Sequence, residues 1–262
     1  MTSFLQSLRS LRHDFWLRVS ERLRWSRGTC RESPALTLSG LAPEEAQRIA
    51  ALQQRYQLRF ERRMNAATSR RNYEYLDILD RAWQAAGAPR LAVRELCDVG
   101  CASFWYAAAL QAFFRPQRLT GVDVEGYRLL RSGHSRRDLA AGYLESLPDA
   151  RFIVADYTGL DHPADLITEW FPFVTPEAIL AWRLPLRLLR PERLFARIAR
   201  NLTASGRFLM VNHGPREADI ARSFCLAAGL IPEFASPATT VLQPLSAYRS
   251  AVPMVSLWRR EH

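Results

Sequence analysis

Acidic residues stand at the ends of four successive apolar segments in the second part of the chain. Asp98 closes one segment just before Gly100, and Asp123, Asp156 and Glu169 close the next three. Carboxylates that meet at one edge of a sheet can accept hydrogen bonds from ribose hydroxyls and from an adenine amine. Gly100 lets the main chain approach a ligand closely, because glycine has no side chain. These residue types predict a site for a nucleoside ligand.

The elements that would position these residues follow from the hydropathy pattern. From about residue 91 onward, short apolar segments alternate with amphipathic ones, which is typical of strands separated by helices. We expect strands at 91–99, 119–124, 151–155, 165–168, 207–212, 230–234 and 253–258, with helices at 104–114, 125–147, 191–202 and 215–228. This pattern predicts an α/β fold with a mostly parallel sheet and helices on both faces. Ligands then bind at the carboxyl ends of the strands, near the switch in strand order.

The first 90 residues have a different character. We expect helices at about 43–60 and 73–86, whereas segment 28–43 contains two glycines and two prolines and is typical of a linker. We therefore divide the chain into a helical N-terminal extension, residues 1–90, and an α/β domain, residues 91–262.

Residues 1–27 predict an amphipathic helix with arginines in and beside its apolar stripe. The stripe comprises Phe4, Leu8, Leu11, Phe15, Val19 and Leu23. Three interpretations remain open. The helix docks on the main domain, lies on an anionic membrane surface, or acts as a targeting segment.

The basic residues exclude several kinds of chemistry. All 36 of them, in a chain of 262 residues, are arginines. Without lysine the chain cannot form a Schiff base, a phosphate-binding P-loop or the lysine site of a protein kinase. Because arginine stays charged, any proton transfer must use His, Asp, Glu, Tyr or Cys.

The formal net charge of +10 is concentrated at the N-terminus. Residues 1–94 hold 17 arginines against 9 acids, whereas the rest of the chain is nearly balanced, which argues against nucleic acid as a partner. The four cysteines form no CxxC pair and lack zinc-ligand spacing, so we expect a reducing compartment and no metal site. No stretch reaches about 18 uninterrupted apolar residues. We expect a cytoplasmic protein, with membrane association through residues 1–27 as an open alternative.

Five segments resemble, in order, motifs of the class I S-adenosylmethionine-dependent methyltransferases, which have a Rossmann-like fold. They are residues 95–101, 121–123, 152–156, 164–169 and 201–209. The resemblance covers about residues 91–258. It implies S-adenosylmethionine as the cofactor and methyl transfer as the reaction.

The resemblance also implies roles for individual residues. Those of the first motif would shape the methionine end of the cofactor site, those after the second strand would hold the ribose, and those after the third would border the adenine. From residue type alone, the acids among them also have a structural interpretation as caps or turn residues. The residues expected to bind the cofactor are Asp98, Gly100, Cys101, Asp123, Val124, Asp156 and Tyr157.

The glycine-rich turn departs from the family pattern. Two further glycines usually follow at alternating positions, but this chain has Ala102 and Phe104 there. Either the phenylalanine packs against the sheet and leaves the turn open, or it fills the cofactor space. The same turn argues against a nicotinamide enzyme, because Ala102 and Trp105 stand where that fingerprint requires glycine.

Methyl transfer requires an acceptor placed in line with the sulfonium and, for some acceptors, a base. Our candidates for that base are Glu169 and His213, each at the end of a predicted strand. Both also have other interpretations. Glu169 would equally cap a loop or bind the amino group of the cofactor, and His213 would equally be a hydrogen-bonded surface residue.

We expect the acceptor to be a small molecule or a cell-envelope precursor. Arg70, Arg71 and the arginines between 183 and 193 would suit an anionic acceptor. Two alternatives stay open: a catalytically silent protein of this fold that binds a partner through its N-terminus, and a nucleic-acid methyltransferase.

Overall fold

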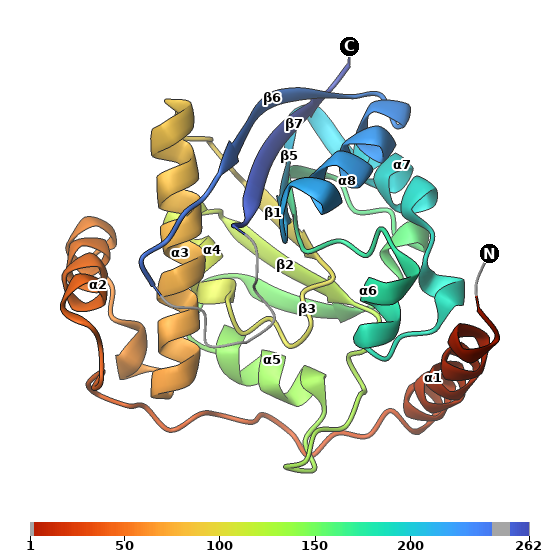
Figure 1. The fold of residues 1–262 in the computed structure, drawn as a ribbon. Helices are drawn as coiled ribbons and strands as arrows, with labels where there is room; N and C mark the ends of the chain where they lie inside the picture. Colours follow the sequence, from red (N-terminus) through yellow and green to blue (C-terminus); the bar gives the residue numbers. More distant parts are fainter. Residues whose placement is uncertain (1–2, 243–251, 262) are drawn as a thin grey trace.

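The computed structural model describes residues 3–242 and 252–261, in which seven strands form one sheet (Figure 1). The strands are β1 (Glu95–Val99), β2 (Arg118–Asp123), β3 (Ala150–Val154), β4 (Ala164–Trp170), β5 (Leu202–Asn212), β6 (Leu230–Pro237) and β7 (Met254–Arg260). Their order is β3-β2-β1-β4-β5-β7-β6. Strands β1 to β5 pair in parallel, and β7 runs antiparallel to both β5 and β6. The expected α/β fold with a mostly parallel sheet is confirmed.

The sheet is covered by helices on both faces. The helices are α1 (Phe4–Leu23), α2 (Pro43–Tyr56), α3 (Ala66–Ala86), α4 (Ala107–Phe114), α5 (Arg136–Leu144), α6 (Pro176–Ala181), α7 (Pro191–Asn201) and α8 (Pro215–Ala227). Successive side chains of a strand point to opposite faces, so each central strand serves two cores. Leu96 and Leu166 pack on the side of α3 and α4, whereas Cys97 and Ile167 pack on the side of α7 and α8.

Helix α3 belongs to the first of these cores. Tyr73, Leu76 and Leu79 are fully buried, and the helix lies beside α4 and the outer strand β6. It begins at Ala66, before the expected residue 73, because the side chain of Asn65 caps it by accepting a hydrogen bond from the Thr68 amide. Helix α2 is held to α3 by ion pairs of Arg48 with two buried aspartates. The division into an extension and a domain stays a prediction.

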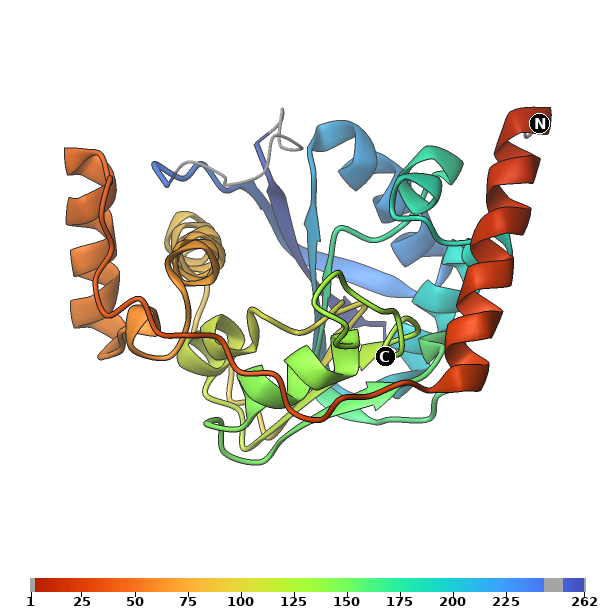
Figure 2. The same ribbon diagram turned by 90° about the horizontal axis from the view of Figure 1, so that it is seen from below.

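Helix α1 packs against the far side of the molecule from α2, and the chain between them runs along the base of α5 (Figures 1 and 2). Cys30 donates a main-chain hydrogen bond to the carbonyl of Asp138 in α5. The buried residues of α1 are His13 and Leu17. Neither belongs to the stripe expected from the sequence, and Phe4 and Phe15 of that stripe are largely exposed. The helix therefore docks on the domain, but with the opposite face.

Candidate functional site

The strand order changes direction at β1, which lies between β2 and β4. Here successive crossovers go to opposite sides and leave a crevice at the carboxyl ends of the strands. Val99 is paired with Val122 on one side and with Glu169 on the other. The register therefore brings the ends of β1, β2 and β4 together, and with them the sequence-predicted acids Asp98, Asp123 and Glu169.

The turn after β1 keeps the backbone of a glycine-rich loop although only one glycine is present. Gly100, Ala102 and Phe104 have φ angles of 68°, 54° and 53°. This left-handed conformation costs a residue with a Cβ atom about 1–2 kcal/mol. Two such residues in five positions require support from their surroundings.

The ring of Phe104 supplies that support because it lies in the core. The residue is fully buried, and its ring makes an edge contact with that of Tyr106. It packs on Gly121 in the middle of β2, where a methyl group would lie 2.4 Å from Cδ1 of Phe104. The space around the missing side chain of Gly100, in contrast, is open to at least 4 Å. Phe104 therefore packs against the sheet and leaves the turn open.

Asp123 is bound to the same turn by its carboxylate. One oxygen accepts a hydrogen bond from the Ala102 amide at 2.8 Å, and the other accepts one from the Glu125 amide at 2.7 Å. Burial raises the pKa of Asp123, and Arg136 opposes that shift. Each carboxylate oxygen has a second lone pair, so both retain capacity for a ligand hydroxyl.

Asp98 is fully buried beneath the turn. Its carboxylate accepts hydrogen bonds from the hydroxyls of Tyr106, at 2.6 Å, and Thr168. Burial raises its pKa to about 7, although both hydroxyls act in the opposite direction. Asp98 thus ties β1 to β4 and to the segment before α4, and its carboxyl group titrates near neutral pH.

Glu169 occupies the end of β4 with unused hydrogen-bonding capacity. In the part of the chain that the structure describes, its Oε2 and the Nε1 of Trp170 are buried without a hydrogen-bond partner. Burial, together with the charges of Asp98 and Glu217, raises the pKa of Glu169 to about 8. The two groups are consecutive in β4 and point to opposite faces of the sheet. A buried polar atom without a partner is costly in a core and is expected where a polar ligand binds.

A group of aromatic side chains lies at the end of β4 and forms what we call the aromatic corner. It consists of Tyr75, Trp105, Tyr106 and Trp170. Tyr75 of α3 stacks on Trp170 with a centroid distance of 4.1 Å and contacts Trp105 and Tyr106 edge-on or tilted. The contact of Tyr75 with the end of β4 could not be predicted from the sequence, because its spacing in α3 is that of ordinary core packing. Its place beside the end of β4 depends on how α3 lies across the sheet.

The other predicted site residues lie in different surroundings. The Cys101 side chain is fully buried below the turn, and the Tyr157 hydroxyl accepts a hydrogen bond from Asn201 inside the second core. The structure therefore does not bring these two side chains to the open crevice. His213, after β5, stacks on Phe171, after β4, with a centroid distance of 3.9 Å, so it does reach the aromatic corner.

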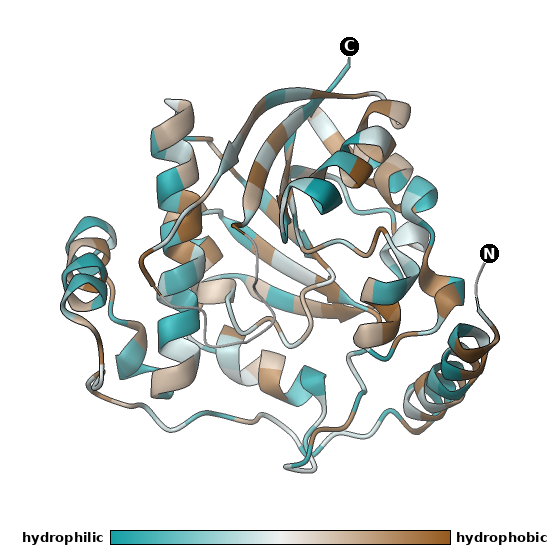
Figure 3. Ribbon diagram, in the orientation of Figure 1, coloured by the Kyte–Doolittle hydropathy of each residue, from teal (hydrophilic) through white to brown (hydrophobic). Residues whose placement is uncertain are grey.

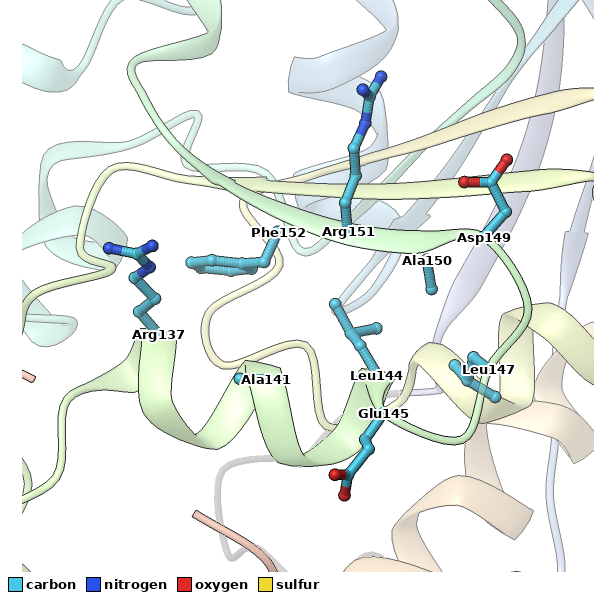
Figure 4. A pocket seen from close by; sticks show the side chains of 9 residues that line it. All are labelled: Arg137, Ala141, Leu144, Glu145, Leu147, Asp149, Ala150, Arg151 and Phe152. Carbon is cyan, nitrogen blue, oxygen red and sulfur yellow. The ribbon is translucent and has the colours of Figure 1, made fainter. Parts of the chain in front are cut away.

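Val124 and Asp156 line a hollow of about 290 Å³ beyond the ends of β2 and β3. Glu21 and Arg24, at the end of α1, form another of its walls. The hollow therefore lies between the ends of β2 and β3 and the end of α1, next along the chain from Asp123. A second hollow, of about 420 Å³, lies between α5 and the edge strand β3 and contains Arg137 and Phe152 (Figure 4). None of the predicted site residues lines it.

The strand order has a further distinguishing feature, since β7 is inserted antiparallel between β5 and β6. Five parallel strands in the order 3-2-1-4-5, followed by an antiparallel strand 7 and then strand 6, are the strand arrangement that identifies the fold. The chain has the class I methyltransferase fold. The first motif of that fold corresponds here to β1 with the turn at Gly100.

No family model matches the sequence, and no curated protein matches it significantly. Solved structures with the class I methyltransferase fold do resemble it. A chain of the Haloferax volcanii complex between the Trm112 methyltransferase activator and a methyltransferase is 15% identical, with 73% of this chain and 94% of that chain covered and a TM-score of 0.49. The N-methyltransferase NodS of Bradyrhizobium japonicum WM9, in complex with S-adenosyl-L-homocysteine, is 13% identical, with 72% and 86% covered and a TM-score of 0.49.

Magnesium protoporphyrin IX methyltransferase from Synechocystis PCC 6803, with bound S-adenosylmethionine, is 13% identical. The alignment covers 97% of each chain, with a TM-score of 0.47. Because these likenesses are distant, the assignment of the class I methyltransferase fold rests on the order and directions of the strands.

Proposed function

We propose that this protein is an S-adenosylmethionine-dependent methyltransferase that acts on a small-molecule acceptor. The observation that carries the proposal is the open space at Gly100 beside the buried, unpaired Oε2 of Glu169. A protein that had lost its ligand would gain stability by filling such a space or by pairing such an oxygen.

The residues of the crevice fit the cofactor in order along the sheet. Gly100 admits the main chain close to the methionine portion, and Asp98 supports that turn from below. Asp123 offers its remaining lone pairs to the ribose, and Val124 and Asp156 border the hollow in which the adenine would lie. When bound, S-adenosylmethionine supplies a methyl group activated by its sulfonium charge.

In this proposal Glu169 is the base that accepts the proton which the acceptor loses on methylation. Its side chain is buried at the end of β4, and its pKa is raised to about 8. Only the ionised form accepts a proton, so this role predicts a rate that rises as the pH passes from neutral through about 8. His213, stacked on Phe171, is the second candidate, and its position suits contact with a planar acceptor.

The proposal extends to the acceptor as a small molecule or a cell-envelope precursor that carries an anionic group. Arg71 supports this extension, because its guanidinium lies 5.7 Å from the ring centroid of Trp105, which belongs to the aromatic corner. Arg70 and Arg187 support it less, because they are paired with Glu45 and Asp14.

Titration calorimetry with S-adenosyl-L-homocysteine tests the proposal. We expect saturable binding, weakened at least about tenfold by Asp123→Asn, because a neutral amide accepts weaker hydrogen bonds from the ribose than a carboxylate. The matched control is Asp161→Asn, at an exposed position outside the crevice, which should leave the affinity unchanged.

Absence of binding at millimolar ligand, with protein that circular dichroism finds folded, contradicts the proposal and favours a silent binding protein of this fold. If binding is seen, Glu169→Gln should retain it. Transfer of a labelled methyl group to small-molecule extracts should then be lost or strongly reduced in that variant. Labelling of RNA instead of small molecules would favour a nucleic-acid methyltransferase.

A further inference from the structure

Helix α1 is fixed to the domain by its polar face. Leu17 packs into a cluster with Ile179 and Leu180 of α6. On the same face, Asp14 forms an ion pair with Arg187, and Ser10 accepts a hydrogen bond from the amide of Leu186. Residues 10, 14 and 17 share one side of a helix, because each residue turns the chain by about 100°.

The opposite face of α1 is apolar and exposed to solvent. This outer stripe consists of Phe4, Leu5, Leu8, Leu11, Phe15, Trp16 and Leu23. Each of these side chains is between 48% and 77% exposed. Brown, hydrophobic bands recur along α1 at the margin of the molecule in Figure 3. Single exposed leucines are common on proteins, but a contiguous row of this length marks an interaction surface.

Arginines accompany the outer stripe. Arg9 and Arg18 flank it on its two sides, and Arg12 and Arg22 lie within it, from their positions on the helix. Residues 1–27 contain six arginines and two acids. Of these acids, Asp14 is paired with Arg18 and Arg187, and Glu21 lines the hollow beside Val124. The exposed face of α1 is therefore both apolar and positively charged.

We propose that the outer stripe docks on an anionic membrane surface, with α1 parallel to the plane of the bilayer. At such a surface the apolar side chains enter the headgroup boundary, while the arginine side chains extend to the lipid phosphates. The described part of the chain contains no helix long and apolar enough to cross a membrane. The contact that we propose is peripheral, so it does not require a membrane-spanning helix.

The arginines within the stripe favour a membrane over a second copy of the chain. In a two-fold dimer built on this face, the stripe would meet itself, so that Arg12 and Arg22 face the same charges in the partner. Burial of such charges without counter-ions is costly. Anionic lipid headgroups supply the counter-charge and can rearrange around each guanidinium.

The test is co-sedimentation of the full chain with vesicles of phosphatidylcholine containing about 40% phosphatidylglycerol, against vesicles of phosphatidylcholine alone. We expect pelleting with the anionic vesicles, reduced several-fold when the ionic strength is raised. The double variant Leu11→Ser/Phe15→Ser should weaken partitioning at least about tenfold, because two apolar anchors are lost. Both positions are exposed, so the fold should be retained.

The control is Leu226→Ser, which removes an exposed leucine, 49% exposed, from α8, outside the outer stripe. It should pellet like the unmodified chain. Equal pelleting of the control and the double variant would overturn the proposal, as would failure of the unmodified chain to pellet. A concentration-dependent dimer in analytical ultracentrifugation, dissociated by the double variant and without affinity for vesicles, would instead assign the stripe to a second copy.

Discussion

At the scale of single residues, the turn after β1 depends on a pair of unusual neighbours. Phe104 stands in a left-handed conformation, and Gly121 lacks the side chain that would obstruct its ring. The two residues are distant in sequence and meet only because β1 and β2 are adjacent in the sheet. The ring of Phe104 is thus accommodated by the glycine at position 121.

This pairing predicts that substitutions at the two positions are coupled. Phe104→Ala should lower the free energy of unfolding by about 3 kcal/mol, since it empties a fully buried site. Gly121→Ala should lower it by about 1–3 kcal/mol through overpacking. The double variant should lose less stability than the sum of the two single losses, by at least about 1 kcal/mol. The reason is that the methyl group added at position 121 then occupies the space left by the ring.

Urea denaturation of the four proteins measures this coupling, and calorimetry of Phe104→Ala measures its affinity for S-adenosyl-L-homocysteine. The affinity should be unchanged. Strictly additive losses would contradict the packing of the Phe104 ring on Gly121. A marked gain of affinity in Phe104→Ala would mean that the ring occupies the cofactor space.

At the scale of elements, α1 is the helix whose packing differs most from its hydropathy. A helix normally buries its apolar face, yet α1 buries His13 and Leu17 and exposes the stripe that contains Leu11. Burial and the neighbouring Arg12 lower the pKa of His13, so this buried residue stays neutral at neutral pH. The docked position of α1 also closes one wall of the hollow beside Asp156.

We predict that Leu17→Ala loosens α1 without unfolding the domain. Loss of a buried leucine costs about 2–4 kcal/mol, and here it removes the principal apolar contact of the helix. Hydrogen exchange should therefore accelerate for amides of residues 4–23 and change little in β1 and β4. Leu11→Ala is the matched control, because Leu11 is 68% exposed. If both variants exchange alike, Leu17 does not anchor the helix.

At the scale of the whole molecule, stability and proposed function are linked through buried acids at the switch point of the sheet. Glu169 and Asp98 have pKa values raised by burial to about 8 and about 7. The folded chain therefore binds protons that the unfolded chain releases at lower pH. Such groups stabilise the fold at low pH, and their contribution declines as the pH rises through the folded-state pKa values.

From this linkage we predict that the free energy of unfolding falls by about 3–4 kcal/mol between about pH 6 and about pH 8. Glu169→Gln should make the decline clearly shallower, because the amide does not ionise. Glu145→Gln should not, because Glu145 is exposed and its hydrogen bond to Arg31 lowers its pKa. Denaturation curves measured across this pH range give the free energy of unfolding at each pH. If Glu169→Gln leaves its slope against pH unaltered, the prediction is contradicted.

The sequence by itself determined the α/β architecture and the places of the acids, because both depend on local patterns. Alternating apolar segments specify strands and helices, and a residue at the end of a parallel strand must lie at the ligand-binding edge. The positions of Asp98, Asp123 and Glu169 follow from that rule. The architecture and the positions of these acids can therefore be predicted without knowing which side chains contact each other.

The tertiary structure decided what depends on contacts between distant segments. Phe104 could not be placed from sequence, because the space that receives its ring is created by Gly121 on the next strand. Tyr75 reaches Trp170 at the end of β4 only through the path of α3, and α1 exposes its apolar face because its polar face fits α6. Hydropathy measures how favourable burial is, but shape and polar complementarity between elements determine which face is buried.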